Sequence, residues 1–451
     1  MLAHATPESW LLSSYSIDRM RVAWFSPLPP VRSGIATVNA ALLGRLDGEA
    51  AIDCFIDRRA YAETRPPRER ALFDAHDFVW KMRRAPYDLV VYQLGNAAWH
   101  DYMWAYLARY PGLVVLHDPR LHHARARHLL QQGRADDYRA EFRYDHPDAV
   151  SDFAEYAVVG LGGPIYYAWP MLRVVARTAR MVAVHNARVA ADLREAFPGA
   201  RVETIRLGVP AAAASAGARE RVRAAHGIPE HAIVFAAFGK ITAEKRIAAT
   251  LGALASLVQD GVDAHLLLAG DPSDCPTLAR DISAAGLETR VHVAGYVEDR
   301  AIGEYLAAAD ACLCLRWPTA LETSASWLEC LAAERPTVIT DLAHLVDVPR
   351  EVALRVDLLD EDASLAAAMR ALASDPALRA ATARAGRAYW LAHHTVDGMA
   401  EDYRRILPIA AQQPAPRADD LPPHFVDDCS GRARAIAAAF GVAIDVLGEP
   451  G

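Results

Sequence analysis

The 451-residue sequence has little lysine and little cysteine, and its apolar stretches are short. Only three of its 48 basic side chains are lysines (Lys81, Lys240 and Lys245), and the formal net charge is −8. A protein whose main task is to bind nucleic acid is expected to be basic, so this composition disfavours that class of partner. The six cysteines are scattered and form no CxxC pair, which argues against a disulfide framework and against a zinc site.

The sequence also lacks a candidate membrane-spanning helix. The uncharged stretch at 157–172 is interrupted by glycines and prolines and is shorter than the roughly 20 residues that cross a bilayer. With 53% hydrophobic and 23% charged residues, the chain can bury a large core, which excludes wholesale disorder. We therefore expect a cytoplasmic protein that contacts a membrane at most peripherally, on its inner face.

Short apolar runs recur along the chain and alternate with stretches whose apolar residues have helical spacing. Such runs are typical of strands buried on both faces of a parallel sheet. The expected strands are residues 22–25, 52–56, 89–94, 113–116, 181–184, 233–238, 266–269, 291–294, 311–315, 337–339 and 353–356. Repeated strand–helix–strand units of this kind predict an α/β fold of doubly wound sheets with five or six strands each.

A break in the pattern divides these runs into two groups. Gly208 and Pro210 precede an alanine-rich stretch, and a new strand begins at Ile233. We expect two Rossmann-like domains, 20–208 and 209–395, which face each other across a cleft.

The ends of the chain are expected to lie outside these domains. A helix is predicted at 396–410, and the proline-containing segment 411–451 is expected to be a linker and tail. Residues 1–19 are expected to be an unstructured extension, and the start of translation stays open between Met1 and Met20.

Two of the three lysines lie at the end of a predicted strand. The strand at 233–238 runs into Gly239, Lys240 and, five residues later, Lys245. A glycine at a strand end followed by two cations is suited to holding a diphosphate. The segment is not a Walker A loop, because the second glycine and the Gly-Lys-Ser/Thr order are missing. The alternative is an ordinary loop with solvated charges.

A second candidate segment, 316–329, follows the predicted strand 311–315 and opens a helix. Thr323, Ser324 and Ala325 are small or can cap the helix, which leaves backbone N–H groups open to an anion. If Glu322 and Glu329 lie on that helix, their carboxylates share a face at about 10 Å separation, which suits two hydroxyl-bearing parts of one ligand. The alternative is a capped helix with one solvated face.

These two segments resemble the donor-binding motifs of retaining GT-B glycosyltransferases of family 4, the group 1 glycosyltransferases. The loop at 25–36, with Gly34, is similar to the amino-terminal loop of that family, and Leu116-His117-Asp118 is similar to another of its motifs. The four motifs occur in the order of the family, and the resemblance covers about residues 20–410. It implies the GT-B fold, with the helix at 396–410 crossing back to the first domain.

The resemblance also implies roles for single residues. Gly34 allows close approach to the diphosphate and the sugar, and His117 lies beside the sugar. The alternative for His117 is a structural histidine that caps the next helix. Gly239, Lys240 and Lys245 hold the diphosphate, together with backbone groups at Thr323, Ser324 and Ala325. Glu322 binds sugar hydroxyls and Glu329 binds ribose hydroxyls, while the backbone at Tyr296 and Val297 contacts the base. His117, Glu322 and Lys245 are thus the predicted catalytic residues.

The sequence departs from the family in its paired glutamates. They are seven positions apart where the family has eight, and Thr-Ser-Ala-Ser replaces a Gly-Phe-Gly segment. Glu322 is therefore expected to act from a shifted loop. Lys240 stands where arginine is commoner, which keeps the charge but loses the bidentate fork.

Acceptor-side candidates come from the first half of the chain. Gln93, Asn96 and His185 follow predicted strands, although turn formation explains Asn96 and packing explains His185 equally well. The basic stretch 120–127 fits an anionic acceptor, a membrane surface or a solvated helix face. The aromatic stretch 166–169 fits an acceptor platform or the core.

We thus predict an enzyme of the hexosyltransferase type, involved in glycan biosynthesis, that moves a sugar from a nucleotide-diphosphate sugar to an acceptor hydroxyl with retention. It needs no metal and no cofactor besides the nucleotide sugar as co-substrate, and the acceptor is a glycan, a lipid-linked molecule or a small molecule. Two alternatives stay open: a sugar-nucleotide epimerase on the same fold, and a non-catalytic nucleotide-sugar-binding module.

Overall fold

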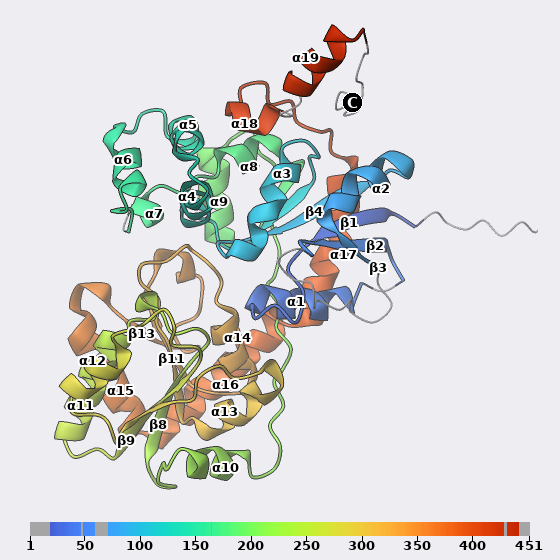
Figure 1. Cartoon of the computed structure of the whole chain (residues 1–451). Helices are drawn as coiled ribbons and strands as arrows, with labels where there is room; N and C mark the ends of the chain where they lie inside the picture. The colour runs from blue at the N-terminus through green and yellow to red at the C-terminus, as the bar shows by residue number, and fades with distance from the viewer. Residues whose placement is uncertain (1–18, 47, 59–70, 164, 428–430, 442–451) are drawn as a thin grey trace, which may run out of the picture.

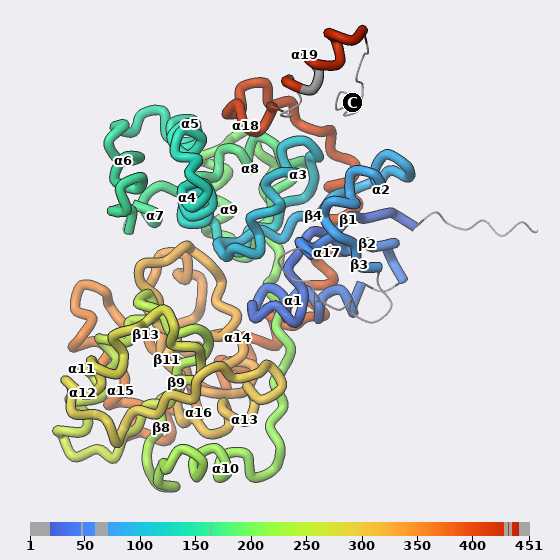
Figure 2. The backbone as a smooth tube through the Cα atoms, in the orientation of Figure 1, coloured from blue at the N-terminus to red at the C-terminus, as the bar shows by residue number. Residues whose placement is uncertain are grey.

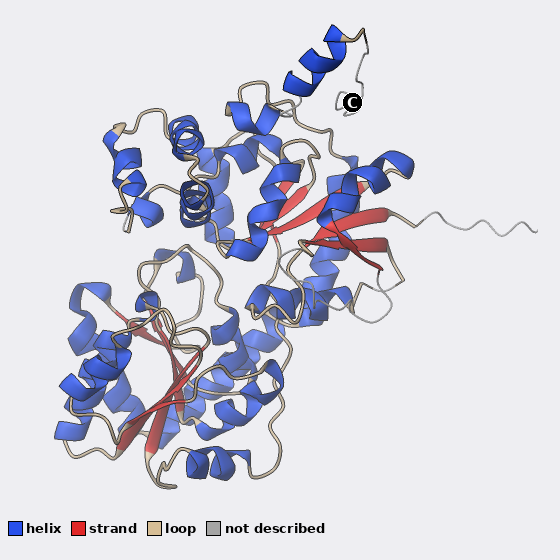
Figure 3. Ribbon diagram, in the orientation of Figure 1, coloured by secondary structure: helices blue, strands red, loops and turns tan. Residues whose placement is uncertain are grey.

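The computed structural model describes residues 19–46, 48–58, 71–163, 165–427 and 431–441. Two parallel sheets, each covered by helices, form the two halves of the molecule (Figures 1 and 3). The first sheet has seven strands, in the spatial order β3 (Ala71–Asp74), β2 (Ala51–Ile56), β1 (Arg21–Phe25), β4 (Leu89–Leu94), β5 (Leu113–Leu116), β6 (Met181–Val184) and β7 (Val202–Thr204). The second has six, in the order β10 (Val291–Val293), β9 (Ala264–Ala269), β8 (Ile233–Phe238), β11 (Ala311–Cys314), β12 (Thr337–Thr340) and β13 (Leu354–Val356).

Helices connect the strands in both halves. Those of the first half are α1 (Gly34–Leu43), α2 (Phe78–Arg84), α3 (Trp104–Leu107), α4 (His122–Gln131), α5 (Ala135–Asp145), α6 (Asp152–Val158), α7 (Ile165–Ala168), α8 (Arg173–Thr178) and α9 (Ala187–Ala196). Those of the second half are α10 (Ala218–Ala225), α11 (Ile247–Gln259), α12 (Leu278–Ala284), α13 (Ile302–Ala308), α14 (Ala325–Ala332), α15 (Glu361–Ser374) and α16 (Pro376–His393). The chain then continues through α17 (Val396–Gln412), α18 (Pro423–Val426) and α19 (Gly431–Ala439).

The central strands follow the apolar runs of the sequence closely. Each residue of β4 and β5 is buried, because helices cover both faces of the sheet. The expectation of five or six strands per sheet is wrong for the first sheet, which has seven. Its two additional strands, β3 and β7, are partly exposed edge strands without a continuous apolar run.

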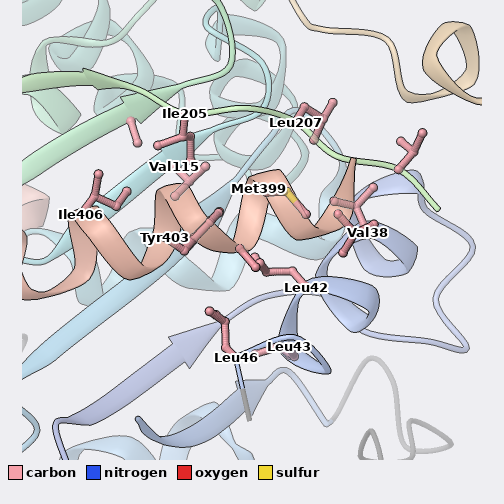
Figure 4. Close-up of a cluster of buried hydrophobic side chains, with 14 of the residues drawn as sticks. Val38, Leu42, Leu43, Leu46, Val115, Ile205, Leu207, Met399, Tyr403 and Ile406 are labelled. Atoms are coloured by element: carbon pink, nitrogen blue, oxygen red, sulfur yellow. The ribbon is translucent and has the colours of Figure 1, made fainter. Parts of the chain in front are cut away.

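The helix α17 joins the two halves. It follows α16 of the second half, yet its residues pack against α1 and β4 of the first. Figure 4 shows Met399, Tyr403 and Ile406 of this helix facing Leu42 of α1 and Val115 of β5, all of them buried. We keep 20–208 and 209–395 as the proposed bounds of the two domains.

The backbone trace shows the carboxyl-terminal segment lying along the first half, beyond α17 (Figure 2). Phe425 of α18 is buried there and packs against Trp104, at 6.3 Å between the ring centroids. The expected extension at 1–19 lies outside the described residues except for Arg19, as do parts of the expected tail.

Candidate functional site

Two helix amino termini, one from each half, meet between the sheets. Helix α1 begins at Gly34 and α14 begins at Ala325. A Cβ atom at Gly34 would lie 3.7 Å from the Cβ of Ala325, so the two backbones approach each other closely. Ser324 caps α14 by accepting a hydrogen bond from the backbone N–H of Trp327. Free backbone N–H groups and the helix dipoles make such a junction attractive to an anion.

Lys245 lies near α14, because the charge of Glu329 on that helix acts on its ammonium group. The turn that follows β8 needs glycine at Gly239, which has φ of +80°, and the Nζ atom of Lys245 would be 3.0 Å from a Cβ atom placed there. The ammonium group donates a hydrogen bond to the carbonyl of Phe238. Burial, and then the nearby Arg316 guanidinium, lower the pKa of Lys245 to about 7.

Lys240 forms an ion pair with a different residue, Asp274. Its Nζ atom lies 2.6 Å from Asp274, and both side chains are about half exposed, at 52% and 53%. Without a ligand Lys240 is thus paired with a carboxylate, and the role predicted for it beside the diphosphate stays a prediction. This partner was not predictable from spacing along the chain, because Asp274 follows another strand, β9.

Arg316 is a residue of the site for which no role was predicted from the sequence. It follows β11, its Nε atom lies 2.8 Å from Glu322, and it is close enough to Lys245 to depress the pKa of that lysine. Its position at a strand end, next to two predicted loops, was the feature of the sequence that could have identified Arg316 as a site residue.

Glu322 lies in the loop before α14, in agreement with the expected shifted loop, and does not share a helix with Glu329. Thr319 donates a hydrogen bond of 2.9 Å to its carboxylate, which Arg316 also contacts. Leu321, just before it, has φ of +62°, a conformation uncommon outside glycine and often found at functional sites. A narrow pocket opens beside Glu322, lined by Arg316 and Ser324 among others.

Glu329 lies on α14, one turn into the helix from Ala325. Within the described part of the chain its carboxylate has no hydrogen-bond partner, and burial raises its pKa to about 7. The negative charge of Asp299 adds to this rise, whereas Lys245 opposes it. The carboxylate is therefore close to Lys245 and available to a ligand.

Tyr296 and Val297 lie in the loop after β10. Val297 packs against the core, and Tyr296 is 40% exposed. The guanidinium of Arg32, from the first half, lies 4.0 Å from the centre of the Tyr296 ring. Close by, Thr37 donates a hydrogen bond of 2.5 Å to Asp299, so this edge of the site is built from both halves.

His117 and His185 contact each other in the interior. His117 is 8% exposed, its Nε2 lies 2.8 Å from Oε1 of Gln93, and its Nδ1 lies 3.2 Å from Nε2 of His185. Because the amide oxygen of Gln93 can only accept, Nε2 of His117 donates to it and Nδ1 accepts from His185. Burial lowers the pKa of His117 well below its usual range, so the ring is neutral at pH 7. Both ring nitrogens are engaged within the protein, which differs from the predicted contact with the sugar.

Gln93 and Asn96 also differ from their predicted acceptor role. Gln93 is completely buried and donates to the hydroxyl of Tyr403 on α17, 3.0 Å away. The Asn96 amide donates to the carbonyl of Arg120, and its oxygen accepts from the N–H of Ala124. Both side chains hold the first half together. His185 likewise serves the interior through its contact with His117.

Asp118, from the first half, interacts by charge with Glu322 of the second half. Burial, followed by the negative charge of Glu322, raises its pKa to about 6. It accepts a hydrogen bond of 2.7 Å from the backbone N–H of Asn96. Asp118 belongs to the Leu116-His117-Asp118 motif, but no role was predicted for it.

The basic stretch after His117 is partly buried. His122 and Arg125 are buried, and Arg125 forms an ion pair with buried Glu141. The expectations of a solvated face and of a membrane-binding surface are therefore wrong for these two residues.

The residues of the aromatic stretch 166–169 have different surroundings. Trp169 packs on the core, whereas Tyr167 donates a hydrogen bond of 2.8 Å to Glu244 of the second half.

The fold and the site together define the class. Two Rossmann-like domains that meet at a junction of helix termini are the GT-B architecture, and the comparisons agree. Residues 230–375 match the family model described as "Glycosyl transferases group 1". This segment of the second half is therefore similar to group 1 glycosyltransferase domains. No curated protein matches the chain by sequence.

Solved glycosyltransferases share the whole fold. Sucrose-phosphate synthase from Thermosynechococcus elongatus is 16% identical, with a TM-score of 0.61 over 87% of this chain and 100% of that chain. HepE of Anabaena, solved in complex with UDP-glucose, gives the same values. A glycosyltransferase from Rickettsia africae is 14% identical, with a TM-score of 0.62 over 88% of this chain and 100% of that chain. At sequence identities this low, the structural similarity shows a shared fold and nothing about substrates.

Among the residues that the structure describes, no group of three or more histidine, cysteine, aspartate or glutamate side chains is placed to hold a metal ion. Nor does any helix there combine the length and the apolar character needed to cross a membrane.

Proposed function

We propose that this protein is a retaining glycosyltransferase that transfers a sugar from a nucleotide-diphosphate sugar to an acceptor hydroxyl, without a metal ion. The observation that carries the proposal is the meeting of two helix amino termini, at Gly34 and Ala325, together with the ammonium of Lys245, which interacts with Glu329 on the second of these helices. An anion bound there interacts with both halves at once, and a diphosphate is the anion that such donors contain.

The remaining donor roles follow from position. Glu329, close to Lys245 and with its carboxylate available, fits the ribose hydroxyls. Glu322, fixed by Arg316 and Thr319, fits the sugar hydroxyls from its loop. Tyr296, held under Arg32, borders the space for the base.

The chemistry we propose is charge stabilisation on the departing diphosphate. Lys245 and Arg316 stabilise the negative charge that develops when the bond between the anomeric carbon and the phosphate oxygen breaks. The acceptor hydroxyl then attacks from the same face, which gives retention. Asp118, with its raised pKa, is a candidate to accept the hydroxyl proton. His117 acts as a positioning residue that fixes the first half of the site.

The test begins with a panel of nucleotide sugars screened by thermal shift. The donor that stabilises the protein is then incubated with candidate acceptors, and the anomeric configuration of the product is read by NMR. We expect transfer with retention that EDTA leaves intact. An inverted product, or activity that EDTA abolishes and magnesium restores, contradicts the proposal.

The same assay separates the alternatives. An epimerase converts the donor to an isomeric nucleotide sugar without any acceptor. A binding module shows donor-induced stabilisation but neither transfer nor slow donor hydrolysis. Either result contradicts the proposed activity.

A further inference from the structure

A second, strongly basic pocket lies in the first half, built from residues that the site above does not use. Its volume is about 550 Å³, within the range of small-molecule sites. Helix α8 and the turn between α9 and β7 form one side, and the segment that follows α17 forms the other. Five arginines line it, and we call it the arginine pocket: Arg173, Arg177, Arg180, Arg201 and Arg417.

The charge of this pocket is opposite to that of the whole chain, which carries a net −8. Asp420 is the one carboxylate in the lining, and it pairs with Arg177 at 3.2 Å while its side chain is 61% exposed. Asp145 lies behind Arg173, whose backbone N–H donates to it. Like charges held close together repel each other, so five arginines around one cavity are costly unless an anion compensates them.

Several guanidinium donors of the pocket are unused. The Nε atoms of Arg173 and Arg180 are buried and have no hydrogen-bond partner. Within the described residues, Arg201 and Arg417 make no side-chain hydrogen bond or ion pair, and both side chains are exposed. Unpaired buried donors are unfavourable, and the planar arginine fork matches the oxygens of phosphate.

We propose that the arginine pocket binds a small soluble molecule that carries two or more phosphate groups. With Asp420 included, the lining carries a net charge of +4, and one phosphate bears at most two charges at neutral pH, so it would leave half of this charge uncompensated. Phe197 and Pro414 in the lining offer an apolar wall beside the cations. This site is separate from the proposed donor site, since the two share no residue.

Calorimetry with inorganic tripolyphosphate tests the proposal. Because Lys245 of the donor site also attracts phosphates, binding is compared among the intact protein, a Lys245→Ala variant and a double variant, Arg201→Ala with Arg417→Ala. We expect the Lys245→Ala variant to keep a tripolyphosphate site and the double variant to bind at that site about tenfold or more weakly. A double variant that binds as tightly as the intact protein overturns the proposal.

A matched control separates the local effect from the loss of net charge. Arg350 and Arg384 are exposed arginines of the second half, so the double variant Arg350→Ala with Arg384→Ala removes the same charge elsewhere. We expect this control to bind tripolyphosphate normally; weakening equal to that of the pocket variant overturns the proposal. Donor binding stays unchanged in the pocket variant, so a failure here is distinct from a failure of the proposed activity.

Lipid headgroups are the other source of clustered phosphates. Vesicles of phosphatidylglycerol therefore form a second arm of the experiment, measured by cosedimentation with the intact protein and the pocket variant. We expect the same vesicle binding for both proteins. Loss of vesicle binding in the pocket variant, without any tripolyphosphate binding in the intact protein, overturns the assignment to a soluble ligand.

Discussion

At the scale of single residues, Lys245 and Glu329 determine how the site responds to pH. Burial disfavours both charged forms, so it lowers the pKa of the lysine and raises that of the glutamate, each to about 7. A bound diphosphate brings negative charge next to both groups. The protonated forms then become more stable, and the pKa of Lys245 rises toward its ordinary value.

Proton uptake on donor binding follows from these pKa values. At pH 8 the unliganded Lys245 is mostly neutral, so binding of a nucleoside diphosphate draws a proton onto it. Calorimetry in buffers of different ionisation enthalpy measures this uptake. We expect net uptake at pH 8 that decreases toward pH 6, where Lys245 is already protonated. Unchanged uptake in a Lys245→Met variant contradicts the assignment.

The two lysines of the loop after β8 are predicted to differ in effect. Lys245→Ala removes the buried ammonium beside the helix termini, and we expect it to weaken nucleoside diphosphate binding by about 1–3 kcal/mol. Lys240→Ala removes a half-exposed charge that is paired with Asp274, so we expect a smaller loss. Affinities of both variants, measured side by side, check this order; a larger loss for Lys240→Ala refutes it.

Arg316 is predicted to lower the pKa of Lys245 and to keep the carboxylate of Glu322 in position. Arg316→Gln removes a positive charge that lowers the pKa of Lys245, so that pKa rises. We expect kcat/KM to fall by a factor equivalent to about 1–3 kcal/mol and the alkaline limb of diphosphate binding to move to higher pH. The shift separates this role from a merely structural one. Arg300→Gln, at an exposed site paired with Glu298, serves as the control and leaves both quantities unchanged.

How far the sequence predicts the site depends on how local each contact is. Lys245 follows Gly239 within one turn, so strand and glycine together locate it. The partner of Lys240 is Asp274, and the partner of His117 is Gln93; both come from other strands. No spacing along the chain contains that information, which is why the roles of Lys240, Gln93 and His117 were predicted differently.

At the scale of elements, the starts of α1 and α14 form the proposed diphosphate site. Central strands and long helices were predictable, because continuous apolar runs mark β8 and helical periodicity marks α11 (Ile247–Gln259). The short edge strands β3 and β7 of the first sheet were missed, since partial exposure leaves them no such run. The start of α14 at Ala325 was also not predictable from the glutamate spacing, because the loop of Glu322 is stabilised by Arg316.

Gly34→Ala tests the junction of the two helices. The added methyl group would lie 3.7 Å from the Cβ of Ala325, an ordinary contact, so we expect no loss of stability in thermal unfolding. The same methyl group narrows the space for a diphosphate, and we expect donor binding to weaken by about 1–3 kcal/mol. Gly252→Ala in α11, where nothing lies within 4 Å of the added methyl, is the matched control. Unchanged donor binding in Gly34→Ala contradicts the proposed site.

At the scale of the whole molecule, contacts on several sides hold the two halves against each other. Tyr167 contacts Glu244 and Thr37 contacts Asp299, both by hydrogen bonds between side chains of different halves. Helix α17 adds an apolar connection that buries Tyr403 within the first half. The donor site lies between these connections, so it depends on the halves being close together.

A crystal structure with the nucleoside diphosphate selected from the donor panel tests the central claim most directly. We predict phosphate oxygens within hydrogen-bond distance of the Lys245 ammonium and of backbone N–H groups at the start of α14, with Gly34 opposite. A diphosphate bound away from this junction, with Lys245 and Ala325 uncontacted, would contradict the account.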